Sequence, residues 1–307
     1  MSRAVKVGVS ERSSFVIDDA RMGARWMIER ARAARDAGLD SLFVGDHHGV
    51  PVPYYQNTPI MGRMLAEWND NSAGVLMLLP LWNPVVAAEQ IGTLASIATG
   101  PFILQCAVGG GAEQFDAVGS DIKRRPSLFE AGLDTIRRLC AGEEVTGTAP
   151  HRFGPTRIAP IPPEPLEVWI GGHAPPVVDR AARLGDGWLV GPEASFAEAR
   201  ELLDRYREAC ARHGREPTAI ALRRDVHVGA DDADADRVAG PVLAAGYRGF
   251  APGVCVVGGP ARVTDELRQF ADLGFTDVIL RHLANEQDEV LASYERLAPV
   301  RVSLADA

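Results

Sequence analysis

The chain has 307 residues, of which 46% are hydrophobic and 24% are charged, and a chain of this kind can bury a large core. Its 32 lysine and arginine residues are outnumbered by 41 aspartate and glutamate residues, which gives a net charge of −9. This acidic balance argues against a nucleic-acid or anionic-membrane partner, because both select a basic surface. No apolar run reaches the ~20 residues of a membrane span, and we see no signal-peptide pattern.

The four cysteines are far apart in the sequence. This spacing excludes a CxxC metal or redox pair and argues against a disulfide framework. We therefore expect free thiols in a cytoplasmic protein.

Strands and helices are predicted to alternate along the chain. Residues 5–9 form a short β-rich run, and the helical pattern that follows ends at Gly38, since glycine commonly stops a helix. The other expected strands, in chain order, are residues 41–44, 73–80, 102–108, 167–170, 188–190, 220–228 and 277–280. Among the helices between them, residues 128–139 and 196–210 carry apolar stripes at helical spacing.

One pattern occurs three times: the end of a helix, a glycine, a polar turn and an apolar strand. It covers residues 36–44, 183–190 and 272–280. Apolar strands that follow helices are typical of a parallel sheet covered on both faces. Eight such units predict an α/β protein with a (β/α)8 TIM barrel, as a single domain of residues 1–307. A doubly wound sheet is the alternative, because the sequence does not show whether the sheet closes.

Residues 141–165 interrupt this alternation with six prolines and three glycines. The segment is too long for an ordinary loop, so we expect an irregular Pro-rich excursion after the fourth helix. Residues 231–236 contain four aspartates. We interpret them as a solvated helix start, where carboxylates suit the positive end of the helix dipole.

The active site of a parallel barrel lies at the carboxyl ends of the strands. The second expected strand is followed by Asp46, His47 and His48, an acid and two imidazoles suited to proton transfer or hydrogen bonding. The fourth strand leads into glycines 109–111, and the fifth into residues 171–176, where a glycine-rich turn precedes a helix. Such turns present free amides to anions such as phosphate. The dinucleotide and triphosphate fingerprints are both absent.

Three segments carry a wider pattern: residues 38–48, residues 78–104, and residues 168–174 with 185–188. The second is the most specific, since it combines Pro80 with an Asn-Pro helix start at 83–84 and an Ala-Glu-Gln run at 88–90. In order and spacing these segments resemble the luciferase-like flavin and deazaflavin oxidoreductases, a (β/α)8 barrel family. The resemblance extends from about residue 5 to residue 300.

The resemblance implies an oxidoreductase that holds a reduced flavin or deazaflavin in the barrel mouth. Its chemistry would be hydride transfer or monooxygenation of a small organic substrate. In the family the isoalloxazine ring lies over the third strand, at a bulge that often contains a non-prolyl cis peptide. That position corresponds to Val75, Leu76 and Met77, with Leu78 beside the ring.

The resemblance also implies the polar contacts. Asp46 matches an acid that contacts the cofactor, and His47 matches a histidine that donates or relays a proton, so both are candidate catalytic residues. We expect the Asp46 carboxylate to orient His47 or the ring. The other implied cofactor contacts are Val108 and Gly109 in the fourth-strand turn, and Gly172, His173 and Ala174 in the loop whose amides hold the phosphate.

Departures from the family narrow the function. Light-emitting members, which use FMN, have an arginine at the position of Val108 and a reactive cysteine at that of Ala107. Cys106 is next to that position, but adjacent strand residues face opposite sides, so we interpret it as a core thiol. Sugar-phosphate dehydrogenases of the deazaflavin branch have a catalytic acid where Gly110 stands. The sequence supports neither light emission nor sugar-phosphate oxidation.

The cofactor is predicted to be coenzyme F420 or FMN. Asp46 followed by His47 resembles the deazaflavin branch, whereas His48 resembles the FMN branch. The missing phosphate arginine shifts the balance slightly towards F420. FMN-using members often receive reduced flavin from a separate reductase, so a flavin or deazaflavin reductase is an expected partner, and we expect a homodimer.

Two alternatives stay open. A metal-dependent barrel lyase or hydrolase would use Asp46, His47 and His173, but the other strand ends offer few ligands, and we predict no metal site. A non-catalytic flavin-binding relative would have the same fold. The presence of a proton donor, His47, argues for an enzyme.

Overall fold

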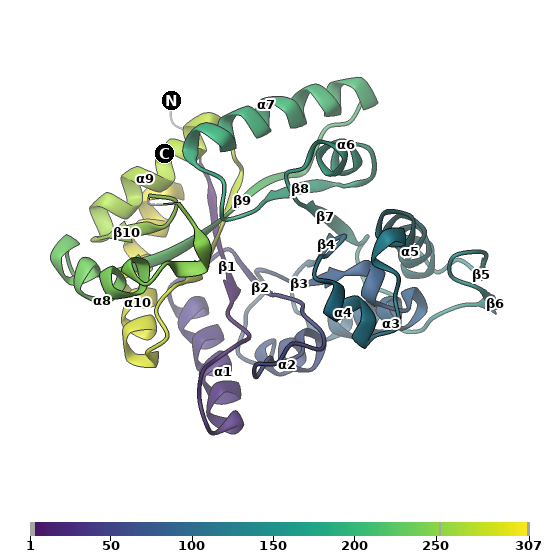
Figure 1. Cartoon of the computed structure of the whole chain (residues 1–307), viewed down its shortest axis with the longest axis horizontal. Helices are drawn as coiled ribbons and strands as arrows, with labels where there is room; N and C mark the ends of the chain where they lie inside the picture. Colours follow the sequence, from purple (N-terminus) through teal and green to yellow (C-terminus); the bar gives the residue numbers. More distant parts are fainter. Residues whose placement is uncertain (1–3, 252, 306–307) are drawn as a thin grey trace. The chain divides into compact units, whose positions relative to one another are not determined.

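The computed structural model describes residues 4–251 and 253–305. Its strands are β1 (Lys6–Glu11), β2 (Ser41–Val44), β3 (Ser72–Leu78), β4 (Phe102–Ala107), β5 (Val145–Gly147), β6 (Phe153–Thr156), β7 (Glu167–Gly171), β8 (Gly187–Val190), β9 (Ala219–Val228), β10 (Val256–Gly258) and β11 (Asp277–His282). Its α-helices are α1 (Ala20–Asp36), α2 (Asn57–Met64), α3 (Pro84–Ile97), α4 (Ala112–Ala117), α5 (Arg125–Cys140), α6 (Pro175–Leu184), α7 (Phe196–His213), α8 (Asp232–Ala244), α9 (Pro260–Leu273) and α10 (Gln287–Ala305). Short 3-10 helices are η1 (Leu79–Leu81), η2 (Ile122–Arg124) and η3 (Tyr247–Gly249). Figure 1 labels the helices and most of the strands in sequence colours.

The main sheet has the strand order β10-β9-β11-β1-β2-β3-β4-β7-β8, and β8 also pairs with β9. This last pairing closes the sequence of neighbours from β9 round to β8. The pairs β1–β11, β11–β9, β9–β8, β8–β7 and β3–β4 are parallel. The predicted (β/α)8 barrel is therefore confirmed, and the doubly wound sheet is wrong.

The described residues form two compact units. The first contains residues 4–12, 25–42, 169–251 and 253–305, and the second contains residues 13–24 and 43–168. In the first unit α10 packs on β1, β9 and α9; in the second, α3 packs on β4, α2 and α5. Within these residues no helix combines the length and the apolar character that crossing a membrane requires. The single domain over residues 1–307 stays a prediction.

The repeated helix-to-strand pattern uses its glycines in two ways. Gly38 and Gly274 follow α1 and α9 with φ angles of 72° and 109°, in the left-handed region that favours glycine. Gly185, after α6, has a φ of −82°, which any residue can adopt. A Cβ atom at this position would lie 2.7 Å from the carbonyl oxygen of Gly187. Here the glycine is needed because the backbone passes so close to it.

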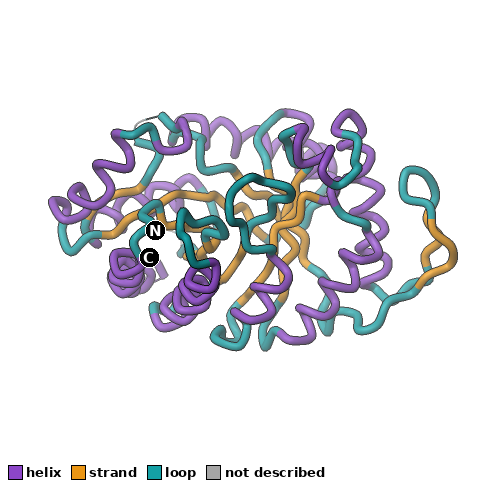
Figure 2. The backbone as a smooth tube through the Cα atoms, turned by 60° about the horizontal axis from the view of Figure 1, so that its bottom comes forward, coloured by secondary structure: helices purple, strands orange, loops and turns teal. Residues whose placement is uncertain are grey.

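The chain between α5 and β7 is more regular than the sequence predicts. Strands β5 and β6 pair there as an antiparallel hairpin, which Figure 2 shows as a separate pair of strands. The sequence also misses β10, which pairs with the end of β9, because three apolar residues are too few to show a period. The third strand ends at Leu78 rather than at residue 80, since the next three residues form η1.

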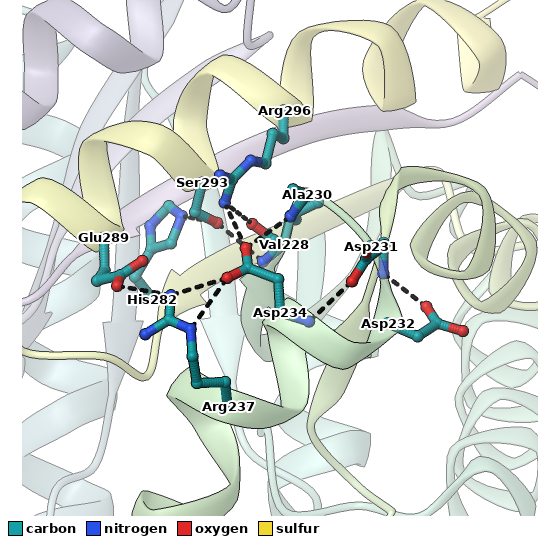
Figure 3. A network of polar contacts seen from close by, with 11 residues as sticks. Val228, Ala230, Asp231, Asp232, Asp234, Arg237, His282, Glu289, Ser293 and Arg296 are labelled. Carbon is teal, nitrogen blue, oxygen red and sulfur yellow. Dashed lines mark hydrogen bonds and ion pairs between the residues drawn. The ribbon is translucent and has the colours of Figure 1, made fainter.

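The acidic run begins α8, as predicted. Asp231 is the N-cap residue, and its side chain accepts a hydrogen bond of 2.8 Å from the amide of Asp234. The Asp234 carboxylate accepts a hydrogen bond from the Ala230 amide and pairs with Arg237 and Arg296. Figure 3 shows these contacts between the start of α8 and α10. The hydrogen bond from the Ala230 amide lowers the pKa of Asp234 most, and the hydrogen bond from Arg237 lowers it further. The aspartates of this run therefore stabilise local structure.

Candidate active site

Asp46, just after β2, is 1% exposed. Its Oδ2 accepts a hydrogen bond of 2.7 Å from the Leu78 amide and one of 2.8 Å from the indole Nε1 of Trp82. Hydrogen bonds to an ionised acceptor are about twice as strong as neutral ones. The buried carboxylate therefore fastens the loop after β2 to the end of β3 and to the residue that follows η1.

His48 is the histidine that lies beside Asp46. Its Nε2 is 3.1 Å from Asp46 Oδ1, although the two atoms are not aligned for a hydrogen bond, and 18% of the His48 side chain stays exposed. Its ring meets the Trp82 ring edge-on, with 5.3 Å between the centroids. One ring nitrogen thus faces a buried acid while part of the ring faces solvent, which suits an imidazole that exchanges protons.

His47 is exposed and is oriented by other residues. Its Nδ1 lies 3.1 Å from Oε1 of Gln114, on α4, and its ring meets Tyr54 edge-on at 5.2 Å. The same Gln114 oxygen accepts a hydrogen bond from the His48 amide. Asp46 therefore meets His48 rather than His47, which turns towards α4. The other expectation, that Asp46 orients the cofactor ring, stays a prediction.

The ring-lining residues expected on β3 differ in exposure. Val75 and Met77 are 0% exposed and Leu78 is 6% exposed, whereas Leu76 is half-buried. Side chains alternate along a strand, so Leu76 and Leu78 share one face. They belong to an apolar cluster with Leu81, Trp82, Ala107, Phe115 and Ile122. On β3, only Leu76 and Leu78 have side chains that join this cluster; those of Val75 and Met77 lie on the other face.

The expected bulge does not occur in the pairing of β3 with β4. The register runs without a shift from Ala73 opposite Phe102 to Leu78 opposite Ala107. Within the described residues, the cis peptide bonds precede Pro150 and Pro160. The cis peptide expected near Leu76 is therefore wrong for the described backbone, which continues as a regular ladder.

The turn after β4 leaves a partly open surface. Val108 and Gly109 are half-buried, and Gly109 has a φ of 70°, in the region that favours glycine. No atom lies within 4 Å of the position that a Cβ of Gly110 would take. Nη1 of Arg125, at the start of α5, lies 3.5 Å from the carbonyl oxygen of Gly109. A cation that the sequence analysis missed is therefore present at this turn.

The turn after β7 has fewer free amides than its sequence suggests. Gly172 has a φ of 132°, and its amide donates to the Leu189 carbonyl at 3.0 Å. Helix α6 begins with two prolines, which have no N–H group. The amides of His173 and Ala174 remain to face an anion. Nδ1 of His173 lies 3.0 Å from Glu193 Oε1, so its side chain already has an acidic partner.

A cavity of about 320 Å³ adjoins this turn. Its charged lining consists of His173, Glu193, Glu198, Glu201 and Arg205. Three carboxylates disfavour an anion on this side. The backbone amides, rather than the cavity, are the part of the turn that suits a phosphate.

In residues 4–251 and 253–305, no three His, Cys, Asp or Glu side chains are arranged to hold a metal ion. Asp46 meets His48, but His47 turns to Gln114. Two of the ligands that the metal-dependent alternative requires, Asp46 and His47, are therefore directed to different partners. Cys106 is a buried free thiol, in agreement with a core role.

Comparison with known proteins identifies the family. The profile of the luciferase-like monooxygenases matches residues 9–253. The chain belongs to this family. The resemblance found in the sequence and the expected class of enzyme, an oxidoreductase, are thereby confirmed.

Relatives of this luciferase-like protein have several named activities. An F420-dependent glucose-6-phosphate dehydrogenase from Intrasporangium calvum is 24% identical over 89% of this chain and 93% of the relative. The oxygenating constituent of 3,6-diketocamphane monooxygenase from Pseudomonas putida, solved with FMN, has a TM-score of 0.84 at 17% identity and covers 99% of this chain and 98% of its own. An F420-dependent secondary alcohol dehydrogenase has a TM-score of 0.78 at 15% identity and covers 97% of this chain and 99% of its own. The structural likenesses confirm the fold.

We predict that Asp46→Ala lowers the free energy of unfolding by about 3 kcal/mol, because it leaves the buried Leu78 amide and the partly buried Trp82 indole without an acceptor. Asp46→Asn keeps one acceptor oxygen and should cost less. Asp116→Ala, which removes an exposed carboxylate on α4, is the matched control and should be nearly neutral. Urea unfolding measures all three; similar stability of Asp46→Ala and the control would contradict the anchoring role.

Proposed function

We propose that this oxidoreductase takes coenzyme F420 at the ends of β3 and β4, with FMN as the second candidate, and transfers a hydride to or from a small organic substrate. The observation that supports this function most is the Asp46–His48 pair beside the half-buried apolar side chains of Leu76, Trp82 and Ala107. A flat, largely apolar ring suits an apolar surface with few polar groups. The names of the F420-dependent relatives favour the deazaflavin.

The residues of the chain would hold the ring from several sides. Leu76, Leu78 and Val108 offer apolar contacts, and Gly109 lets the β4 turn approach closely because it has no side chain. Arg125 adds a positive charge at that turn. When bound, the deazaflavin supplies a hydride donor or acceptor.

Asp46 and His48 would manage the proton that accompanies hydride transfer. The carboxylate is fixed by two N–H donors, so it can stabilise a positively charged imidazole and fix its orientation. Since Nε2 faces the acid, Nδ1 is the atom that exchanges a proton with substrate. A positioned acid or base of this kind contributes about 10²–10⁴-fold.

The amides of His173 and Ala174 are proposed to hold the cofactor phosphate. Two prolines remove the first donors of α6, and the Gly172 amide is engaged by Leu189. The role of Gly172 is then to adopt the positive φ that the turn requires, rather than to donate its amide to the phosphate.

Cellular context belongs to the same proposal. Cys106, Cys140, Cys210 and Cys255 are free thiols, which is typical of the reducing cytoplasm. We propose a cytoplasmic homodimer, supplied by a separate reductase if FMN is the cofactor. Light scattering of the purified protein measures the oligomeric state.

We expect purified protein to bind F420 more tightly than FMN, because the residues that resemble the deazaflavin branch outweigh those that resemble the FMN branch. Titration of each cofactor, followed by its fluorescence, measures both dissociation constants. Tighter binding of FMN would reverse the cofactor assignment. Binding of neither cofactor would contradict the proposed function.

We also expect His48→Ala to slow single-turnover cofactor oxidation at least tenfold, about 1.4 kcal/mol of barrier, with little change in cofactor affinity. His47→Ala is the matched variant, since it removes the neighbouring imidazole that does not meet Asp46. The sequence predicts His47 as the proton donor, whereas the contacts of the two rings favour His48. A slow His47→Ala enzyme beside a normal His48→Ala enzyme would decide for His47.

A further inference from the structure

A second polar cluster lies in the first unit, at the carboxyl ends of β9 and β11. Arg281 of β11 lies opposite Asp225 of β9 in the parallel register. The next residue, His282, packs on Tyr294 of α10, with 4.3 Å between the ring centroids. Because successive strand residues point to opposite faces, Arg281 and Asp225 are on the face that is turned away from α10.

Asp225 organises one side of this cluster. It is 1% exposed, and its Oδ2 lies 2.7 Å from Nη1 of Arg248. Arg248 has a φ of 51°, a left-handed conformation that is costly for a residue with a side chain. Its guanidinium carbon also lies 4.7 Å from the centre of the Phe250 ring. Strained residues persist where their surroundings hold them, and such positions gather at functional sites.

A further arginine joins from the end of β1, because Arg12 directly follows that strand. Burial lowers the pKa of Arg12 most, and the positive charge of Arg281 lowers it further. Tyr247 and Asp225 raise it. The charges of Arg281 and Asp225 thus both act on the Arg12 guanidinium, and Arg281 lies opposite Asp225 in the strand register.

The cluster has an excess of positive charge. The arginines Arg12, Arg248 and Arg281 lie around Asp225, in a chain whose net charge is −9. Arg281 has no carboxylate oxygen within 4 Å in residues 4–251 and 253–305. Cations crowded into a partly buried place repel one another strongly. An anion bound among them would relieve that repulsion.

We propose that Arg12, Arg248 and Arg281 bind an oxyanion, a carboxylate or a phosphate group, of the substrate. Guanidinium groups donate paired hydrogen bonds that match the oxygens of both groups. The cluster lies at the carboxyl ends of barrel strands, where substrates of this fold bind. Burial, followed by the charge of Asp225, raises the pKa of Tyr247 to about 12, so its hydroxyl is a donor at neutral pH. That the anion belongs to a substrate rests on the proposed function; the anion site itself does not.

Isothermal titration of the full-length protein with inorganic phosphate and with acetate, at low ionic strength, tests the site. Wild type should bind at least one of the two ions, and the tighter one indicates which anionic group the substrate carries. Arg281→Met keeps an unbranched apolar side chain and should weaken binding at least tenfold. Arg281→Lys keeps the positive charge but not the paired N–H donors of the guanidinium group. Its affinity for the anion should lie between those of wild type and Arg281→Met. Arg207→Met removes an exposed arginine of α7 and should bind like wild type.

Absence of binding of either ion to wild type, or unchanged affinity in a folded Arg281→Met protein, overturns the proposal. Circular dichroism melting establishes that the variants are folded. An F420 titration of the same proteins separates the two claims. If phosphate binding depends on Arg281 while neither F420 nor FMN binds, the anion site stands and the proposed function falls. If F420 binds while the affinity for phosphate or acetate is the same in Arg281→Met as in wild type, the proposed function stands and the anion site is wrong.

Discussion

The carboxylate of Asp46 holds three separate stretches of the second unit together. It receives the amide of Leu78 at the end of β3 and the indole of Trp82 after η1, and it faces the imidazole of His48. A buried charge is tolerated only when it is paired and hydrogen-bonded. The loop after β2 must therefore follow the end of β3. The position of His48 beside the apolar side chains of Leu76 and Trp82 is a consequence of that single constraint.

The two units carry polar groups of different character. In the second unit an acid and an imidazole adjoin apolar side chains, an environment for a flat ring and a proton. In the first unit arginines gather around Asp225, an environment for an anion. The net charge of −9 makes the second feature informative, because composition alone would not place three arginines together. On these two grounds we propose that the substrate of this oxidoreductase is small and negatively charged.

The sequence predicted the barrel well because its signals are local. Apolar runs and stop glycines such as Gly38 and Gly274 mark the ends of elements without reference to the rest of the chain. The site was predicted less completely, since Trp82 lies 36 positions from Asp46 and Gln114 lies 67 positions from His47. Trp82 stands in the most family-specific segment, which is a signal that was present. The local sequence does not indicate whether His47 or His48 turns towards the buried Asp46.

The central claim is that a deazaflavin ring is held next to His48. Nuclear magnetic resonance of protein labelled with ¹⁵N at histidine tests it directly, with His47→Ala and His48→Ala used to assign the two rings. Addition of F420 should shift the ring resonances of His48 more than those of His213, which pairs with the exposed Asp179. Unchanged His48 resonances in protein saturated with F420 would contradict the account.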